Sequence, residues 1–444
     1  MILAGGILLQ ALNMYLTSAL MPSIVSDIGG QAYYAWVTTA FIVASVAATM
    51  AVPAVLGRLG SRVSYLVAAG AFGVGSAVAA AAPAMELLLV GRIVQGVGGG
   101  LLSGLAFALI RSSLPEQAWG KGTAIISAMF GVGTLAGPAI GGAFAQFDGW
   151  RLAFGVVAVV AVVLGIGATS ILPRSSRSET TNRLPWLSLL VLTAAVAALS
   201  LAGVVPGWWF WIALIAGAVL LLAFVAVDRA ARSGVLPSIT YGAGSLKWIY
   251  IALALTTTVT ASEAFTPLFG QRIFALMPFA AGFLGATVSA GWSATALMSA
   301  RVTAPRTQQR MTLAGPAITA AMMLVLVLLQ FVPTSPWVLT GWVVALIIAG
   351  AGTGLSNPHL SVSVMSSVGN DADGAKAAAA IPVASLIGQA IVAALGGTLV
   401  NAGLPSYPHA ASNLFILLGV VALLGVFAVR ASNRHQPRLG SHRD

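Results

Sequence analysis

The chain contains no cysteine among its 444 residues. Disulfide bridges, thiolate metal sites and cysteine nucleophiles are therefore excluded. The four histidines are His359, His409, His435 and His442, and no two of them have a metal-ligand spacing on one helix. No nucleophile–base pair or metal-binding cluster is visible either. We therefore expect neither an enzyme nor a metal or cofactor site.

Charge is also scarce. Charged residues make up 7% of the chain, hydrophobic residues make up 59%, and the mean hydropathy is +0.97. A soluble domain carries about 25% charged residues, so a water-facing surface cannot be built from this sequence. Each membrane-spanning helix needs about 20 apolar residues, and the chain is long enough for many of them. The composition therefore predicts an all-α integral membrane protein.

Apolar runs of spanning length recur along the whole chain. We expect fourteen membrane-spanning helices, at residues 2–24, 34–56, 64–83, 86–110, 122–146, 152–172, 186–205, 208–228, 248–269, 277–300, 312–332, 336–357, 375–401 and 411–430. The short alternating segments of a membrane β-barrel are absent from the sequence, so each run is expected to be a helix.

The distribution of basic residues supports this count. If the amino end is cytoplasmic, 18 of the 21 lysines and arginines fall in cytoplasmic loops or in the carboxyl tail. Adding or removing one span would destroy this asymmetry, which is typical of membrane proteins. We expect a multi-pass protein of the cell membrane with both termini cytoplasmic. The same distribution explains the net charge of +11 without a nucleic-acid partner.

Two hydrophilic segments divide the spans into sets of six, two and six. The expected organisation is an N-terminal six-helix bundle (1–173), a cytoplasmic linker (174–185), two extra helices (186–228), a second linker (229–247), a C-terminal six-helix bundle (248–430) and a cytoplasmic tail (431–444).

The fifth span carries a dense glycine pattern around one proline. Gly133, Gly137 and Gly141 recur every four residues and form one smooth helix face, with Pro138 and Gly142 beside them. Such a face lets a neighbouring helix backbone approach closely in lipid. The pattern is compatible with a plain packing groove or with a contact that moves during gating, and we favour gating.

These residues resemble the signature of a known transporter family. Gly137-Pro138-Ala-Ile-Gly141-Gly142, preceded by Gly133, is similar to the antiporter motif of major facilitator drug:proton antiporters. Leu-Leu-Val-Gly-Arg92-Ile-Val-Gln95-Gly96 is similar to the conserved arginine motif of that family.

Three further segments carry the same resemblance. They are Gly57-Arg58-Leu-Gly60-Ser-Arg62 after the second span, Asp148-Gly-Trp150-Arg151 before the sixth, and Leu12-Asn13-Met-Tyr-Leu-Thr-Ser-Ala19-Leu20-Met-Pro22 in the first. The last resembles the first-helix motif of the fourteen-helix branch. The resemblance covers the amino half closely, whereas the carboxyl half matches mainly in the layout of its spans.

The resemblance implies a major facilitator fold, with two six-helix bundles plus two inserted helices. It also implies export of an amphipathic or cationic small molecule against inward-moving protons, by alternating access to a central cavity. In this family, Arg58, Gly60 and Arg62 would belong to a conformational motif between the second and third helices. Two departures matter: the family usually has aspartate at the positions of Gly57 and Asn13, and the latter carboxylate is often assigned to proton coupling.

Ionisable groups inside spans are costly in a membrane and usually have a partner or a role. Glu263 lies well inside the ninth span, and because Asn13 is neutral, Glu263 is our candidate for proton coupling. The alternative is a salt bridge with Arg272. Arg92 lies six residues into the fourth span and has no acid nearby except Glu86. It could bind backbone carbonyls or snorkel outward, or it could sense substrate or a proton on a neighbouring carboxylate.

Polar and aromatic residues of several spans could line a central cavity. Gln10, Asn13 and Thr17 share one face of the first span because they are three and four residues apart. The further candidates are Gln95, Thr134, Phe265, Trp292 and Gln389. Each of these residues could equally be an ordinary contact between helices.

The sequence contains no nucleotide-binding motif that could supply energy from ATP. Gly96-Val-Gly98-Gly99-Gly100 lies inside an apolar span with no preceding strand and no Walker lysine, so nucleotide binding is rejected. We therefore expect a monomeric transporter whose partners are a small-molecule substrate, protons and the lipid bilayer. Two alternatives stay open: uptake or facilitated exchange of a metabolite or lipid, which the neutral Asn13 favours, and a non-transporting membrane sensor.

Overall fold

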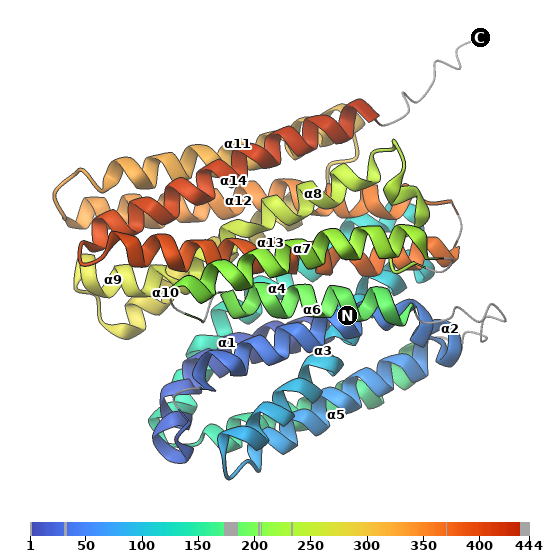
Figure 1. Cartoon of the computed structure of the whole chain (residues 1–444), viewed down its shortest axis with the longest axis horizontal. Coiled ribbons are helices and arrows are strands. Elements are labelled where there is room, and N and C mark those ends of the chain that lie inside the picture. Colours follow the sequence, from blue (N-terminus) through green and yellow to red (C-terminus); the bar gives the residue numbers. More distant parts are fainter. Residues whose placement is uncertain are drawn as a thin grey trace.

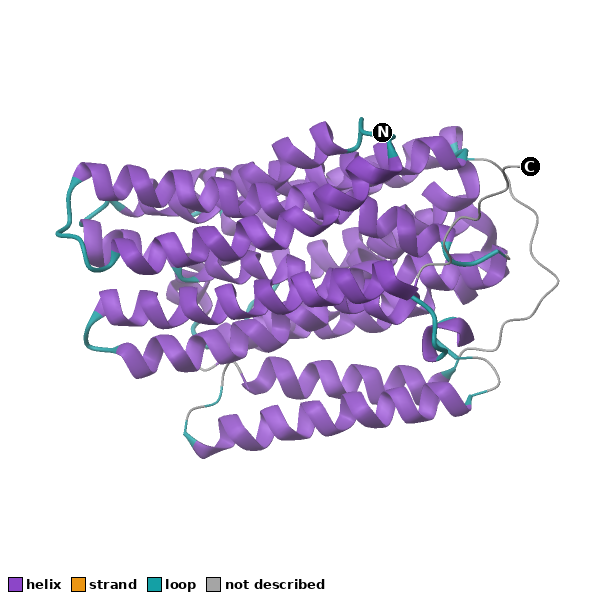
Figure 2. Cartoon of the chain, turned by 90° about the horizontal axis from the view of Figure 1, so that it is seen from above, coloured by secondary structure: helices purple, strands orange, loops and turns teal. Residues whose placement is uncertain are grey.

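In the part of the chain that it describes, the computed structural model consists of helices joined by loops, with no strand (Figures 1 and 2). It describes residues 2–30, 33–172, 185–202, 205, 207–231, 234–369 and 371–435. Helices follow from the composition, because a helix satisfies its own backbone N–H and C=O groups where no water can. Nearly all of the expected linker 174–185 and most of the expected tail 431–444 lie outside the described residues.

The first bundle contains six membrane spans in five helices. They are α1 (Ile2–Ile28), α2 (Tyr34–Ala80), α3 (Met85–Ser113), α4 (Glu116–Gln146) and α5 (Trp150–Ile171). Two spans share α2, which leaves helical geometry at Gly60 (φ 74°, ψ 170°). Both halves of α2 flank α3, since Val37 accepts a hydrogen bond from Arg92 and Gly75 lies against Gly91. The loop expected between residues 56 and 64 is thus reduced to one glycine with a positive φ that side chains disfavour.

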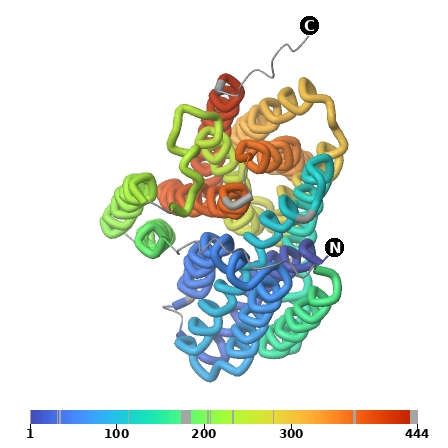
Figure 3. The backbone as a smooth tube through the Cα atoms, turned by 90° about the vertical axis from the view of Figure 1, so that its right-hand side faces the viewer, coloured from blue at the N-terminus to red at the C-terminus, as the bar shows by residue number. Residues whose placement is uncertain are grey.

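The second bundle begins after the two extra helices α6 (Trp186–Ala202) and α7 (Trp208–Ala230) and the short η2 (Ser238–Tyr241). It contains α8 (Leu246–Thr256), η3 (Thr257–Ala264), α9 (Thr266–Phe274), α10 (Pro278–Ser299), α11 (Pro305–Leu329), α12 (Pro336–Ser366), α13 (Asp371–Gly403) and α14 (Tyr407–His435). Seen along the helices, the two bundles lie side by side with α6 and α7 at one flank (Figure 3). There α6 contacts both α2 and α13, so the inserted pair touches both bundles.

The span count of fourteen is confirmed with one change in shape. Ten described helices are long and apolar enough to cross a membrane, and α8, η3 and α9 together make an eleventh span. The second span within α2, the shorter α6 and the 22-residue α10 complete the fourteen. The first and last helices begin and end toward the same end of the molecule, on the right of Figure 1, as an even number of spans requires.

The ninth span differs from the continuous helix expected at residues 248–269. It tightens into the 3₁₀ helix η3 and then bends by 42° into α9. Threonine and serine explain the tightening, because their hydroxyls donate to carbonyls one turn back and compete with regular helix geometry. The hydroxyls of Thr258, Thr260 and Ser262 all bond carbonyls three residues earlier. A 3₁₀ stretch inside a helix often marks a functional hinge, and this one carries Glu263.

Contacts at the two ends of the helices agree with this threading. At one end Tyr65 donates to the carbonyl of Ile2, and Arg62 donates to the carbonyl of Leu172 at 3.0 and 3.2 Å. At the other end Arg151 pairs with Asp27 and also donates to the carbonyl of Ala82. The order of the first six spans places the members of each set on the same side of the membrane, as observed.

The two bundles repeat one another in their glycine contacts. Gly96 and Gly100 of α3 lie against the carbonyls of Phe41 and Ser45, and a side chain at either glycine would collide with them. Gly350 and Gly354 of α12 make the same contacts with the carbonyls of Val288 and Trp292 of α10. The glycines are 254 residues apart and their partners 247 apart. This geometry supports two related six-helix units.

Candidate functional site

Glu263 lies at the junction between the two bundles. It is buried in η3, and its carboxylate accepts three hydrogen bonds. Tyr15 of α1 donates its hydroxyl to Oε2 at 2.7 Å. Ser289 of α10 donates its backbone N–H at 3.1 Å and its hydroxyl at 2.5 Å to Oε1. The carboxylate therefore connects the first helix of one bundle with two elements of the other.

The salt bridge considered between Glu263 and Arg272 is absent from the described residues. The Arg272 guanidinium instead lies over the ring of Tyr407, 5.7 Å from its centroid. Glu263 is thus a buried acid without a basic partner in that part of the chain. Three donors favour its ionised form, whereas burial disfavours any charge.

Arg92 occupies a separate buried site in the first bundle. Its Nε donates to the carbonyl of Val37 at 3.1 Å, and its Nη1 donates to Gln95 at 2.8 Å and to Thr17 at 3.3 Å. The ring of Phe41 lies 4.3 Å from the guanidinium carbon. Binding of a carbonyl, one of the two expectations, is therefore observed. Among the described residues no acid pairs with Arg92, and its Nη2 has no hydrogen-bond partner there.

The network around Arg92 includes three of the residues expected to line the cavity. Gln95 Nε2 donates to Asn13 Oδ1 at 3.2 Å and to the hydroxyl of Ser76 at 2.7 Å, while Thr17 contacts Arg92 directly. All of these side chains are buried. Asn13, at the position where the family usually has a carboxylate, is therefore connected to Arg92 by hydrogen bonds through Gln95. Asn13 itself supplies no charge.

The other cavity candidates are distributed over both bundles. Phe130 of α4 and Trp292 of α10 stack across the junction with ring centroids 6.5 Å apart, and Trp292 Nε1 has no hydrogen-bond partner within the described part of the chain. Gln10 is buried, and its Oε1 also has no hydrogen-bond partner among the described residues. The hydroxyl of Thr134 donates to the carbonyl of Phe130. Phe265 and Gln389 are half-buried. Their role in a cavity stays a prediction.

The glycine face of α4 packs against α1 in its own bundle. Methyl groups added at Gly133, Gly137 and Gly141 would lie within about 2.8 Å of Ala11, Tyr15 and Ala19, respectively. Helix α4 continues through Pro138. Gly142 has open space around it and lies outside this face. The face is therefore a close helix contact, and its role in gating stays a prediction.

The expected conformational motif around Gly60 is only partly involved in contacts. Arg62 anchors the end of α5 through the Leu172 carbonyl, and Gly60 forms the turn. Arg58 is exposed. In the described part of the chain, none of the three residues has a hydrogen bond or ion pair to the second bundle, so their conformational role stays a prediction.

Sequence reasoning did not single out Arg111, which makes a contact between the bundles. From the end of α3 its Nη2 donates to the carbonyl of Val368 at 2.7 Å, and its Nη1 donates to the carbonyl of Met365 near the end of α12. Cations are favourable at helix C-termini because the last carbonyls have no partners within the helix. Tyr15 and Ser289 were likewise not identified, because only the fold brings them to Glu263.

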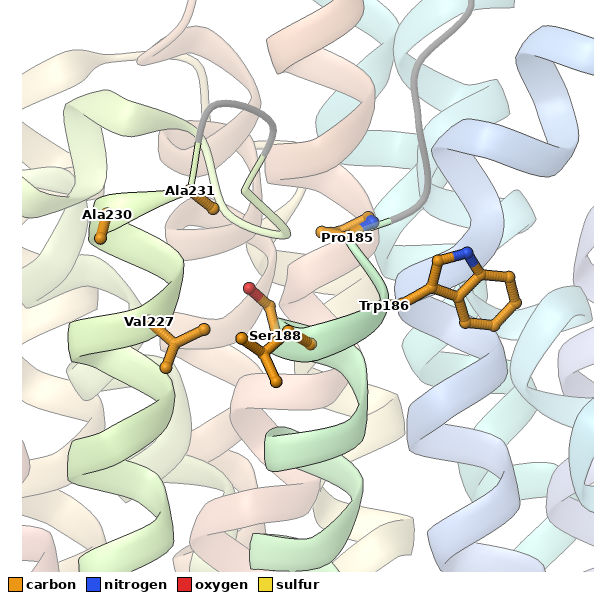
Figure 4. Close-up of a pocket in the computed structure, with 7 residues that line it drawn as sticks. Pro185, Trp186, Ser188, Val227, Ala230 and Ala231 are labelled. Atoms are coloured by element: carbon orange, nitrogen blue, oxygen red, sulfur yellow. The ribbon is translucent and has the colours of Figure 1, made fainter.

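Two hollows lie away from these residues. One, of 410 Å³, lies between the start of α6 and the end of α7 and is lined by Pro185, Trp186, Leu187, Ser188, Val227, Ala230 and Ala231 (Figure 4). Its lining is almost entirely apolar, apart from the buried hydroxyl of Ser188. The other lies between α8 and α14. No group of three or more His, Asp or Glu side chains in the described residues could hold a metal ion.

Known proteins share this sequence and fold. The family described as Major Facilitator Superfamily matches residues 3–191. A "Probable multidrug-efflux transporter" of Mycobacterium tuberculosis is 41% identical over 447 residues, covering 99% of this chain and 95% of that protein. "Multidrug resistance protein 3" of Bacillus subtilis is 26% identical, covering 63% of this chain and 56% of its own length.

Solved structures confirm the fold. The human organic anion transporter MFSD10 superposes with a TM-score of 0.71 at 15% identity, covering 96% of this chain and 98% of that one. The proton:xylose symporter XylE superposes with a TM-score of 0.70 at 15% identity, covering 96% and 93%. With two six-helix bundles, two inserted helices and a full-length relative at 41% identity, the chain belongs to the Major Facilitator Superfamily.

Proposed function

We propose that this protein exports amphipathic or cationic small molecules in exchange for protons, and that Glu263 carries the proton. The name of the 41% identical relative supports efflux of drugs. The observation that carries the proton role is the hydrogen bond between Tyr15 and Glu263, because it places a buried acid on the contact between the two bundles.

Protonation at this position would change the contact itself. Hydrogen bonds to an ionised carboxylate are roughly twice as strong as those between neutral groups. An ionised Glu263 therefore holds Tyr15 of α1 and Ser289 of α10 more firmly than a neutral one does. A ligand shifts a conformational equilibrium by its differential affinity for the two states, and here the proton is that ligand. Proton binding favours separation of the bundles at Glu263.

The available energy is adequate for export. One elementary charge crossing 100 mV releases about 2.3 kcal/mol, which supports roughly a fiftyfold concentration ratio. In this scheme the bundles 1–173 and 248–430 move against each other as a monomer, and the end of the molecule that carries Arg62 and Arg111 is cytoplasmic. The positive-inside asymmetry of the sequence supports that orientation.

Reconstituted vesicles test the proposal. The protein is reconstituted with a fluorescent amphipathic cation, and transport is measured twice: driven by an imposed pH gradient, and as exchange of substrate with no gradient. The test variant is Glu263→Gln, which keeps the size of the side chain and removes its titration. The matched control is Glu86→Gln, since Glu86 is exposed in the first turn of α3.

The expected result is loss of gradient-driven transport in Glu263→Gln with exchange retained, and no change in Glu86→Gln. Full gradient-driven transport by Glu263→Gln would remove Glu263 from the scheme. Counterflow by the unmodified protein that is independent of pH would instead favour facilitated exchange of substrate.

A further inference from the structure

A groove on the outer surface of the second bundle combines an apolar floor with a basic end. It has a volume of 590 Å³ and lies between α8 and α14. Its lining residues are Trp248, Ile251, Leu255, Leu424, Phe427, Ala428, Arg430, Ala431 and Arg434. None of them belongs to the site around Glu263 or to the network around Arg92.

The apolar part of the groove faces outward from the bundle. Ile251, Leu424 and Phe427 are 42%, 50% and 64% exposed. In a chain that crosses the bilayer, such surfaces lie in hydrocarbon and are covered by lipid acyl chains. The eight residues from Trp248 to Leu255 span about 10 Å of helix, which suits the first part of one acyl chain.

The charged end is formed by Arg430 and Arg434. They are four residues apart on α14, so their side chains lie on the same helix face. Both are exposed, and neither takes part in the two ion pairs of the described residues, Asp27–Arg151 and Asp373–Lys376. Among the described residues, the lining of the groove contains no acidic residue. Within that part of the chain, the groove therefore presents two positive charges without a carboxylate to neutralise them.

The groove residues are ordered along the helices as the parts of a lipid are ordered across a leaflet, with apolar residues at the acyl-chain level and the arginines at the headgroup level. The arginines follow the apolar stretch of α14, and Trp248 lies at the start of α8 on the same end of the bundle. Tryptophan is typical of the headgroup level of a membrane, and basic pockets between helices at this level bind anionic headgroups. A soluble anion would use the arginines but leave the apolar floor without a partner.

We propose that this groove binds an anionic phospholipid. The phosphate group lies between Arg430 and Arg434, and an acyl chain lies along Ile251, Leu255, Leu424 and Phe427. The site is independent of proton coupling at Glu263, and its occupant is a lipid of the surrounding leaflet rather than the transported substrate.

Native mass spectrometry of the purified protein in detergent tests this assignment. The protein is titrated with phosphatidylglycerol, and in parallel with phosphatidylcholine of the same acyl chains. Each arginine near the membrane surface contributes about a fivefold gain in affinity for anionic lipid. The double variant Arg430→Gln/Arg434→Gln is therefore expected to bind phosphatidylglycerol at least tenfold more weakly, with phosphatidylcholine binding unchanged.

The matched control is Arg306→Gln/Arg310→Gln. These arginines are also exposed and four residues apart, in the first turns of α11, but they lie outside the groove. The control is expected to bind phosphatidylglycerol as the unmodified protein does, and Arg430→Lys/Arg434→Lys is expected to keep most of the binding. The lysine variant keeps both charges but also replaces both arginines. If it binds phosphatidylglycerol, the loss in the glutamine variant comes from the missing charge and not from misfolding.

Three outcomes would overturn the proposal. One is equal phosphatidylglycerol binding by the unmodified protein and the Arg430→Gln/Arg434→Gln variant. Another is an equal loss in the Arg306→Gln/Arg310→Gln control, which would show a general charge effect. The third is displacement of the lipid by millimolar inorganic phosphate, which would show that the arginines hold a soluble anion and that the apolar floor contributes nothing.

Discussion

The hydroxyl of Tyr15 donates a 2.7 Å hydrogen bond to Glu263, across the junction between the two bundles. Gly137 of α4 lies directly behind Tyr15, and a methyl group there would be 2.6 Å from the Tyr15 Cβ. The glycine face of α4 thus sets how closely α1 can approach and, through Tyr15, where the donor to Glu263 lies. The antiporter-like motif and the buried acid are connected through one side chain.

Replacing Tyr15 with phenylalanine is expected to loosen the junction. The ring is kept and the hydroxyl is lost, and a hydrogen bond to a charged group contributes about 1.5–3 kcal/mol. The equilibrium between bundle arrangements is expected to shift about tenfold or more toward separation at Glu263. Because the chain has no cysteine, spin labels can be placed at Ser26→Cys and Leu268→Cys alone, and their distance distribution measured. An unchanged distribution in Tyr15→Phe would show that the contact does not hold the bundles.

The glycine face provides a second prediction with an internal control. Gly137→Val is expected to push α1 away from α4, because overpacking a tight contact costs about 1–3 kcal/mol, and to displace Tyr15 from Glu263. Gly142→Val adds the same atoms on the same helix, where no atom lies within 4 Å. Gradient-driven transport should fall several-fold in Gly137→Val and stay normal in Gly142→Val. Similar losses in both variants would show that α4 tolerates no added volume, and that the face has no specific role.

Much of this fold could be predicted from apolar runs and loop charge, since a span must be about 20 residues long and basic loops stay on one side. Glu263 stands out as a candidate in the sequence for a related reason, because an acid inside such a run is rare. Its partners could not be found, since Tyr15 is 248 residues away in the chain and Ser289 contributes a backbone group. Only the packing of α1 and α10 around η3 creates the site.

The differences in shape also have local causes. The bend in the ninth span follows from its threonines and serines, a signal present in the sequence but weaker than the hydropathy of the run. For Arg92, the sequence left carbonyl binding and charge sensing open, and the structure shows the former through Val37. The glycine face was correctly expected to make a close helix contact, but the sequence could not show that its partner is α1.

Asp228 is expected to stabilise the connection between α7 and α8. It is buried and accepts from the backbone N–H groups of Val235 and Leu236 at 2.6 and 3.0 Å, and from the hydroxyl of Tyr241 at 2.7 Å. Asp228→Ala leaves these donors without their acceptor, and unsatisfied buried groups cost about 1–3 kcal/mol each. A melting temperature lower by several degrees is expected in detergent. An unchanged melting temperature would mean that water replaces the carboxylate.

The same cluster predicts how the stability lost in Tyr241→Phe depends on pH. Burial, with the hydrogen bond to Asp228, raises the pKa of Tyr241 above its usual value of about 10. A raised pKa in the folded state gives a stabilisation that is fully present below the unfolded-state pKa and is lost as pH rises from that value through the folded-state pKa. The loss of stability in Tyr241→Phe should therefore be the same at pH 6 and pH 8. A penalty that differs between these pH values would show that another group titrates in the cluster.

Arg111 is expected to hold the bundles together at the end opposite Asp27. Its guanidinium donates to the carbonyls of Met365 and Val368, so it connects the end of α3 in the first bundle with the end of α12 in the second. Arg111→Gln removes the charge and shortens the reach, and two charge-assisted hydrogen bonds are lost. The end of α3 is then expected to separate more often from the end of α12.

Spin labels at Glu116→Cys and Ser366→Cys report this separation, because both positions are exposed at the same end of the molecule. A longer mean distance, or a second, longer population, is expected in Arg111→Gln. The control is Arg301→Gln. Arg301 is an exposed arginine just after α10, and its substitution removes the same charge from the same end of the molecule. Because α3 and α12 belong to different bundles, a distance change in Arg111→Gln alone identifies a latch between them. An identical distribution in both variants would leave Arg111 as a cap on α12 with no part in the movement of the bundles.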